Sequence, residues 1–94
     1  MGTVDLHTHS TFSDGTCSPS ELVNKAVSCG LQAIALTDHD TVEGIPDFLE
    51  AAKDMAIEAI PGTELSVGFR DRDIHIVGLF IDHTHEGFQK MSQI

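Results

Sequence analysis

The chain has 94 residues, of which 40% are apolar and 21% charged, a composition that fits one small globular domain and excludes a disordered or fibrous protein. Fifteen acidic residues against five basic ones give a formal net charge of −10, which excludes binding of a nucleic-acid backbone by surface charge alone. Bound cations would relieve repulsion among these carboxylates, although a solvated acidic surface explains the same charge equally well.

Cysteine spacing and hydropathy indicate the cellular compartment in which the protein is expected. Cys17 and Cys29 lack the C-x-x-C spacing of a zinc or redox site, and no signal peptide precedes the first predicted strand. No apolar run approaches the roughly 20 residues that a membrane-spanning helix needs. We therefore expect a cytoplasmic protein with reduced thiols and no membrane role.

The first half of the chain predicts a strand, a helix and a second strand. Residues 3–7 (TVDLH) have extended character and run into a polar loop. Ser18, a following proline and Glu21 form an S-x-x-E capping box, which predicts a helix start, and Gly30 is the residue type that ends a helix in a left-handed conformation. The apolar run that begins at Leu31 is too short for a helix and is typical of a strand buried on both faces of a parallel sheet.

The second half predicts a helix, two strands and the start of another helix. Apolar residues at helical spacing predict a helix over about residues 43–55. Residues 57–69 predict a strand that breaks or bends at a Pro-Gly pair, 70–73 a charged turn, and 74–81 a strand that forms a hairpin with the one before it. From residue 84 the sequence begins like a helix. This alternation predicts an α/β fold with parallel strands, in which the loops at the carboxyl ends build the functional site.

Imidazole and carboxylate side chains recur at the predicted strand ends. They are His7, His9, Asp14, His39, Glu64 and His75. Side chains two apart on a strand share a face, so one metal ion can take both histidines of the H-x-H pair. A lone histidine of this kind is usually a satisfied or surface residue, but six such positions together predict a metal site. Nitrogen and oxygen donors without thiolates suit Zn, Mn or Fe, and carboxylates can bridge two ions.

Four stretches of the chain, read together, point to a family. They are DLHTHSTFSDGT, GLQAIALTDHDTVEGI, PGTELS and DIHIVGLFID. The chain resembles the PHP superfamily, named for polymerase and histidinol phosphatase, and is most similar to its metal-dependent phosphoesterases, which include nucleotide phosphatases and a 5′-to-3′ exoribonuclease. The resemblance implies a distorted seven-stranded β/α barrel with up to three divalent metal ions at its mouth, where water attacks a phosphate ester.

The resemblance also implies a role for each matching residue. His7 and His9 match ligands of one metal ion, Asp14 and His39 match ligands of a second, Glu64 matches the bridging carboxylate and His75 matches a ligand of the third. Asp38 matches an acid that orients a ligand or a water molecule. The implied substrate is a small phosphate ester or a short oligonucleotide.

The later motifs of the family have no counterpart in this sequence. A further ligand histidine and a terminal D-x-H pair are not matched before Ile94, and family members are more than twice as long. We therefore interpret residues 1–94 as the N-terminal portion of a PHP domain, which would associate with copies of itself or with the missing half of the barrel. His83 and His85 are interpreted as capping or surface residues at a helix start.

The leading hypothesis is a metal-dependent phosphoric ester hydrolase acting on nucleotides or short oligonucleotides. A histidinol-phosphate phosphatase, an amidohydrolase-like deaminase, and a non-catalytic metal-stabilised fragment or interaction module stay open. The intact early ligands favour an enzyme, whereas the unmatched later motifs favour a module.

Overall fold

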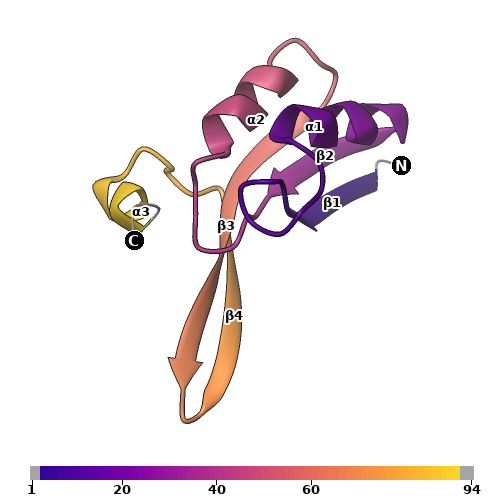
Figure 1. Ribbon diagram of the computed structural model, residues 1–94. Helices are drawn as coiled ribbons and strands as arrows, with labels where there is room; N and C mark the ends of the chain where they lie inside the picture. The colour runs from indigo at the N-terminus through magenta and orange to yellow at the C-terminus, as the bar shows by residue number, and fades with distance from the viewer. Residues whose placement is uncertain (1–2, 92–94) are drawn as a thin grey trace.

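A computed structural model describes residues 3–91, which form one four-stranded sheet with two helices packed on one of its faces (Figure 1). The elements in chain order are β1 (Thr3–Thr8), α1 (Pro19–Ser28), β2 (Leu31–Leu36), α2 (Ile45–Ala52), β3 (Glu58–Phe69), β4 (Arg72–Leu79) and α3 (Glu86–Met91). The strand order is β1-β2-β3-β4; the first three strands are parallel, and β4 runs antiparallel to β3. The predicted α/β class and element order are confirmed. Four strands lie in this part of the chain, so the seven-stranded barrel stays a prediction.

The start of α1 follows the predicted capping box. The Ser18 hydroxyl accepts a hydrogen bond from the Glu21 backbone N–H at 3.2 Å, and a Glu21 carboxylate oxygen accepts one from the Ser18 backbone N–H at 3.0 Å. Gly30 follows the helix with φ of +77°. These reciprocal bonds satisfy two N–H groups at the helix start and fix where the preceding loop ends.

Strand β3 changes its partner at the Pro-Gly pair without being interrupted. Pro61 pairs with Leu36 of β2, and Gly62 pairs with Leu79 of β4. A Cβ atom on Gly62 would lie 2.7 Å from the Gly78 carbonyl oxygen, so the close approach of β4 requires glycine here. The strand therefore continues to Phe69 as predicted, and it changes its partner at the Pro-Gly pair instead of breaking there.

Three predicted boundaries also need correction. The second helix covers Ile45–Ala52 instead of 43–55, because the exposed residues after Ala52 offer no apolar face; Met55, expected on that face, is 39% exposed. The hairpin turn has two residues instead of four: Arg70 and Asp71 both have positive φ, as a two-residue hairpin loop requires.

The bounds of the last two elements also differ from those expected, and β4 begins at Arg72, two residues earlier than predicted. Strand β4 ends at Leu79, and Phe80 follows it with φ of 57°, so residues 80–81 lie outside the strand. Helix α3 begins at Glu86, and the end of the predicted last helix, residues 92–94, lies outside the described part of the chain.

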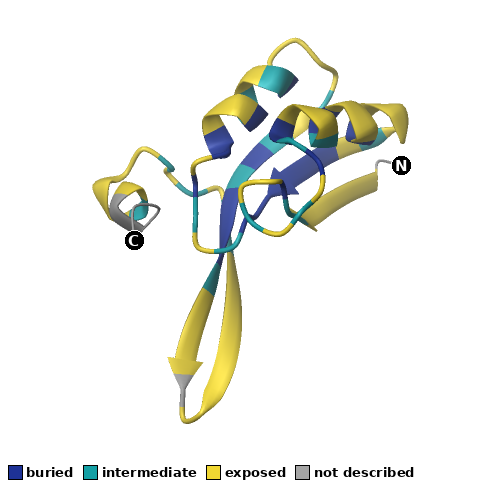
Figure 2. Cartoon of the chain, viewed as in Figure 1, coloured by how far each residue is buried: buried dark blue, intermediate teal, exposed yellow. Residues whose placement is uncertain are grey.

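The main core lies between the two helices and the sheet. Val23 of α1, Leu36 of β2, and Ile45 and Phe48 of α2 are each at most 1% exposed. A smaller cluster of Ala33, Ala35 and Ile60 lies apart from it, whereas β1 and the hairpin are largely exposed (Figure 2). No helix in the described region is both long and apolar enough to cross a membrane.

Candidate metal centre

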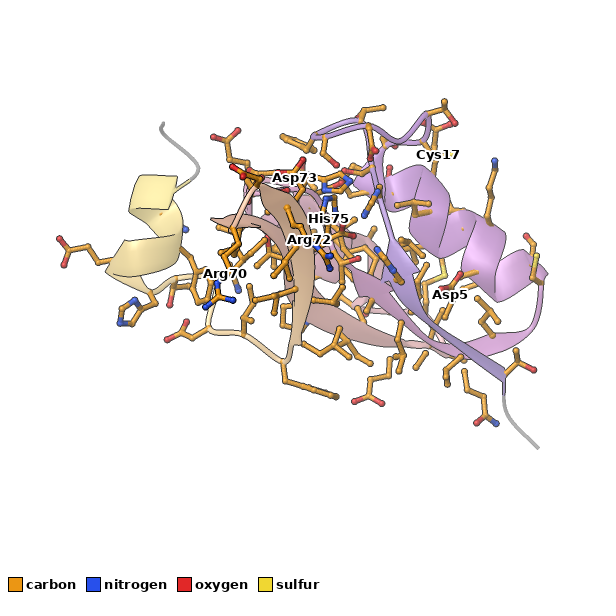
Figure 3. All side chains as sticks on the ribbon, turned by 90° about the horizontal axis from the view of Figure 1, so that it is seen from below. Asp5, Cys17, Arg70, Arg72, Asp73 and His75 are labelled. Atoms are coloured by element: carbon orange, nitrogen blue, oxygen red, sulfur yellow. The ribbon has the colours of Figure 1, made fainter. Side chains whose placement is uncertain are left out.

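The structure brings the six predicted ligand residues together at one edge of the sheet. His7 lies on β1, His9 and Asp14 lie in the loop after it, His39 follows β2, Glu64 lies on β3 and His75 lies on β4. Figure 3 shows the labelled His75 on β4, with Cys17 and Asp5 well away from it. Four separate segments of the chain therefore build the cluster.

Glu64 is the centre of this cluster. Its side chain is buried, and residue exposure is 3%. One carboxylate oxygen, Oε1, contacts Nε2 of His7 and lies 3.1 Å from Nε2 of His9. The other oxygen, Oε2, lies 2.5 Å from Nδ1 of His75 and 3.4 Å from Nδ1 of His39. A single buried carboxylate thus faces four imidazoles, two on each oxygen.

Asp14 supplies a second carboxylate, placed nearer to solvent. Its Oδ1 lies 2.7 Å from Nδ1 of His9, and its Oδ2 lies 3.3 Å from Nε2 of His39. His9 and His39 each use their other ring nitrogen toward Glu64. Both nitrogens of each of these rings therefore point at carboxylate oxygens, which joins the two acids through two shared imidazoles.

The surroundings keep both carboxyl groups ionised. The hydrogen bond with His75, followed by those with His7 and His9, outweighs the effect of burial and lowers the pKa of Glu64 to about 2. Loss of hydration acts to raise the pKa of Asp14, but the charges of His9 and His39 outweigh it and hold this pKa below its ordinary value. At neutral pH each acid is a carboxylate, the form that binds a cation.

The donor atoms fall into three groups that each suit one cation. The groups are His7, His9 and Glu64; His9, Asp14 and His39; and His39, Glu64 and His75. Within each group the donor atoms lie within 4.8 Å of one another, and each group shares a residue with the next. Imidazole nitrogens and carboxylate oxygens are ligands typical of Zn, Mn and Fe. The residues present therefore fit a centre of divalent metal ions.

Asp38 lies under the loop that follows β1, and its contacts are with serines of that loop. It is 2% exposed. Its Oδ1 accepts hydrogen bonds from the Ser10 backbone N–H at 2.6 Å and the Ser13 hydroxyl at 2.8 Å, and its Oδ2 accepts one from the Ser10 hydroxyl at 2.6 Å. Ser10 follows His9 and Ser13 precedes Asp14, so Asp38 fixes the backbone beside two of the clustered residues.

Gly15 is a residue that the sequence reasoning missed. A Cβ atom at this position would lie 2.1 Å from the carbonyl oxygen of His9, and the Gly15 N–H donates a hydrogen bond to the Ser10 carbonyl at 2.8 Å. The loop can fold back on His9 only because Gly15 has no side chain. The available signal was a glycine placed directly after Asp14 in a polar loop.

Threonines beside the clustered residues tie the strand ends together. The Thr8 hydroxyl donates to the Ala35 carbonyl at 2.6 Å, and the Thr37 hydroxyl donates to the Thr8 carbonyl at 3.1 Å. Thr63, which is 1% exposed, donates to the Asp38 carbonyl at 3.0 Å. These bonds restrict the separation of the segments that carry the imidazoles.

The remaining histidines stay outside the cluster. Nδ1 of His85 accepts a hydrogen bond from the Gly87 backbone N–H at 3.0 Å, at the start of α3, and the His83 carbonyl accepts one from Gln89 at 2.6 Å. The interpretation of His83 and His85 as surface or capping residues agrees with these contacts.

Imidazole and carboxylate donors lie at or just beyond the carboxyl ends of parallel strands, the edge at which β/α proteins carry their functional sites. The fold and the candidate site therefore define a protein of the β/α class. A family model described as the PHP domain matches residues 5–94. The chain belongs to the PHP family.

Individual relatives agree with this assignment. The chain is 53% identical over 81 residues to a 5′-3′ exoribonuclease of Haemophilus influenzae, covering 86% of this chain and 30% of that protein. It is 40% identical over 82 residues to a 3′,5′-nucleoside bisphosphate phosphatase of Chromobacterium violaceum, covering 87% of this chain and 29% of that protein. The chain therefore spans about a third of the length of the curated relatives it matches.

Solved structures give the same fold. The structure of an amidohydrolase of Chromobacterium violaceum, with bound sulfate and no metal, superposes with a TM-score of 0.89 at 36% identity, covering 96% of this chain and 32% of that one. A protein of Bifidobacterium adolescentis, assigned as a metal-dependent phosphoesterase, superposes with a TM-score of 0.87 at 33% identity, covering the same shares.

Proposed function

We propose that this chain is part of a metal-dependent phosphoesterase that hydrolyses phosphate esters of nucleotides or short oligonucleotides, and that residues 1–94 are the N-terminal portion of its PHP domain. The observation that carries the proposal is the single buried carboxylate of Glu64, whose two oxygens face four imidazoles. A purely structural role does not explain why four histidines, two from strands and two from loops, are directed at one acid.

The proposal gives each clustered residue a role toward divalent ions, up to three of them. His7 and His9 would hold one ion, Asp14 and His39 a second and His75 a third, with Glu64 as a carboxylate shared between ions. Ions of Mn, Zn or Fe bound there would activate water and neutralise charge on the phosphoryl oxygens. Asp38 acts one step away, because it holds the loop that carries His9 and Asp14.

Exposure of the outer imidazoles favours a site that is open to substrate. The side chains of His7 and His75 are 54% and 49% exposed, whereas those of His9 and His39 are 20% and 26% exposed. The inner residues and Glu64 form the floor, and the outer pair form the rim. We propose that the phosphate ester approaches from the side of His7 and His75.

Charge and the relatives' names support the nucleotide class of substrate. A net charge of −10 repels a long polyanion, so phosphate recognition here depends on bound cations and favours a short substrate or the end of a chain. The relatives are named as an exoribonuclease and a nucleoside bisphosphate phosphatase. We propose a cytoplasmic enzyme whose site is completed by the rest of the barrel or by a second copy of this chain.

The experiment compares metal content and phosphate release for three proteins: the wild-type chain, His9→Ala and His85→Ala. His9 belongs to two of the three donor groups, whereas His85 lies outside all of them and caps α3. Metal content is measured by elemental analysis after dialysis, and hydrolysis is measured as release of inorganic phosphate from a nucleoside 3′,5′-bisphosphate and as release of mononucleotide from a 5′-phosphorylated oligonucleotide.

We expect the wild type and His85→Ala to retain metal and His9→Ala to lose at least one ion per chain. Full metal content in His9→Ala would contradict the ligand assignment. Bound metal without hydrolysis of either substrate would show that hydrolysis requires the rest of the barrel, and hydrolysis of neither substrate by a completed, metal-loaded protein would contradict the substrate class.

A further inference from the structure

Asp40, next to His39, is linked by hydrogen bonds to the segment of β3 that carries Glu64. Its backbone N–H donates to the Glu64 carbonyl at 2.9 Å. Its carboxylate oxygen Oδ1 accepts a hydrogen bond from the Ser66 backbone N–H at 3.0 Å. The Glu64 N–H donates in turn to the Asp38 carbonyl at 3.0 Å. The residues on both sides of His39 therefore hold both backbone groups of Glu64.

The position of Asp40 at the edge of β3 explains why a side chain, and not a neighbouring strand, accepts the hydrogen bond from the Ser66 N–H. Beyond Pro61, β3 pairs with β4 on one edge, and β2 has already ended at Leu36 on the other. Alternate residues of a strand direct their backbone groups to opposite edges, so Glu64 and Ser66 direct theirs toward the edge that β2 has left. After β2 has ended, His39 forms an isolated bridge with Glu64. Two residues further along β3, the Asp40 carboxylate accepts the Ser66 N–H, a hydrogen bond that a backbone carbonyl of a neighbouring strand would otherwise accept.

The backbone of Asp40 has a conformation that few residues adopt. Its φ is 51°, in the left-handed region where glycine is free of strain and asparagine and aspartate are the best tolerated of the others. This turn directs the N–H of Asp40 back to β3. An aspartate at this position therefore combines the turn with the acceptor for Ser66, and glycine would provide only the turn.

We propose that Asp40 is a positioning residue of the metal centre, which sets the distance between His39 and Glu64 through its hydrogen bond to Ser66. Nδ1 of His39 lies 3.4 Å from Oε2 of Glu64, and both belong to the donor group completed by His75. Asp40 belongs to none of the three donor groups found among the described residues. The inference rests on the proposed function, since it concerns the geometry of that same centre.

The test uses three variants of the 94-residue chain, Asp40→Asn, Asp40→Gly and Asp71→Gly. Asparagine keeps the tolerance of positive φ and an oxygen that accepts from Ser66, whereas glycine keeps the turn and loses the acceptor. Asp71, in the hairpin turn with φ of 63°, is the matched control. Asp71→Gly also removes a carboxylate from a residue in the left-handed conformation, but at a position outside the cluster. The dissociation constant for Mn²⁺ is measured by calorimetry, and the visible absorption of bound Co²⁺ reports the coordination geometry.

We expect Asp40→Asn and Asp71→Gly to bind Mn²⁺ within about 3-fold of the wild type with an unchanged Co²⁺ spectrum. Asp40→Gly should bind about 10- to 100-fold more weakly with an altered spectrum, the range seen when a partner that orients metal ligands is removed. Circular dichroism establishes that each variant is folded.

Two results would overturn the inference while leaving the proposed function intact. One is wild-type affinity and spectrum in folded Asp40→Gly; the other is an equal loss in Asp40→Asn, which would assign the effect to the charge of Asp40 instead of its hydrogen bond. If Asp40→Gly does not fold, Asp40→Asn decides alone: wild-type affinity supports positioning, and a loss of 10-fold or more contradicts it. A wild-type chain that binds no Mn²⁺ or Co²⁺ would overturn the proposed function, and the inference with it.

Discussion

His75 contacts Glu64 diagonally across the β3–β4 hairpin. Glu64 pairs with Val77 and His75 pairs with Ser66, yet Nδ1 of His75 lies 2.5 Å from Oε2 of Glu64. A shift of one residue in the hairpin register would turn His75 to the opposite face and away from the acid. The positive φ angles of the two-residue turn at Arg70 and Asp71 fix this register, and glycine also adopts this conformation, so the geometry of the cluster depends on the backbone of the turn and not on its side chains.

The first prediction concerns stabilisation of the chain by metal ions. A metal ion present at 100 times its dissociation constant stabilises the folded chain by about 2.7 kcal/mol, and a 10-fold weaker site reduces this to about 1.4 kcal/mol. We expect Glu64→Gln to show at most the smaller effect, because Glu64 belongs to two of the three donor groups. Thermal unfolding with and without Mn²⁺ measures the difference. Glu50→Gln, on the exposed face of α2, is the control, and equal stabilisation of all three proteins would refute the bridging role.

The second prediction concerns the loop that folds back on His9. Gly15→Ala places a Cβ atom where the His9 carbonyl now lies, so the loop must move and take Asp14 with it. We expect a lower unfolding temperature and an affinity for Mn²⁺ reduced about 10-fold or more. Gly68→Ala is the matched control, because a Cβ atom at Gly68 meets nothing within 4 Å. Unchanged Mn²⁺ affinity in Gly15→Ala would show that the loop adapts without disturbing the cluster.

The third prediction concerns the N-cap of α1. Ser18→Ala removes the acceptor for the Glu21 N–H and should lower the free energy of unfolding by about 1 kcal/mol, measured by urea denaturation. Ser28→Ala, at the exposed end of the same helix, should change it little or raise it, because alanine is the better helix former. Equal effects of the two substitutions would mean that the cap contributes nothing specific.

The fourth prediction gives the pH dependence of the same cap. Hydrogen bonds from the backbone and side chain of Ser18 hold the pKa of Glu21 below its ordinary value of 4.5. A carboxyl with a lowered pKa in the folded state stabilises the fold above its unfolded pKa, and this stabilisation is lost as pH falls through the folded pKa. The stability difference between the wild type and Glu21→Gln should therefore be constant above about pH 5.5 and shrink below pH 4.5. A difference independent of pH would contradict this account.

The fifth prediction concerns the core beneath the helices. Phe48 is fully buried and contacts the main cluster, so Phe48→Ala should cost about 3–5 kcal/mol, enough to unfold much of a chain this small. Phe80 is 68% exposed, and Phe80→Ala should change the free energy of unfolding by about 0.5 kcal/mol or less. Circular dichroism of the two variants tests the contrast, and similar losses would place the core elsewhere.

Local signals made much of the fold predictable. The start of α1 was predicted correctly because Ser18 and Glu21 form a reciprocal cap within four residues. The start and end of α2 were not, because Gly44 at its N-cap makes no side-chain hydrogen bond and no capping residue marks the end at Ala52. The clustered residues could be named because they follow the strands, and the carboxyl ends of parallel strands meet.

The supporting contacts were beyond prediction from sequence. Asp40 and Ser66 are 26 residues apart, and their hydrogen bond exists only in the observed register of β3. Gly15 matters because the backbone of His9 approaches it closely, and a glycine in a polar loop does not indicate by itself which backbone atoms lie beside it. Asp38 is predicted from the sequence to orient a ligand or a water molecule. Its contacts with Ser10 and Ser13 could not be predicted, because they depend on how the loop folds over it.

The change of partner within β3 divides the sheet into a parallel arm and a hairpin arm, joined by the chain at Pro61 and Gly62 and by the hydrogen bonds of Asp38 and Asp40 to Glu64. His39 follows the parallel arm, whereas Glu64 and His75 belong to the hairpin arm. An ion held by these three residues would add one more link across this junction, beyond the hydrogen bonds of Asp38 and Asp40 to Glu64, and its loss would weaken the attachment of the hairpin. The metal centre would then contribute to the stability of the sheet as well as to the chemistry at its edge.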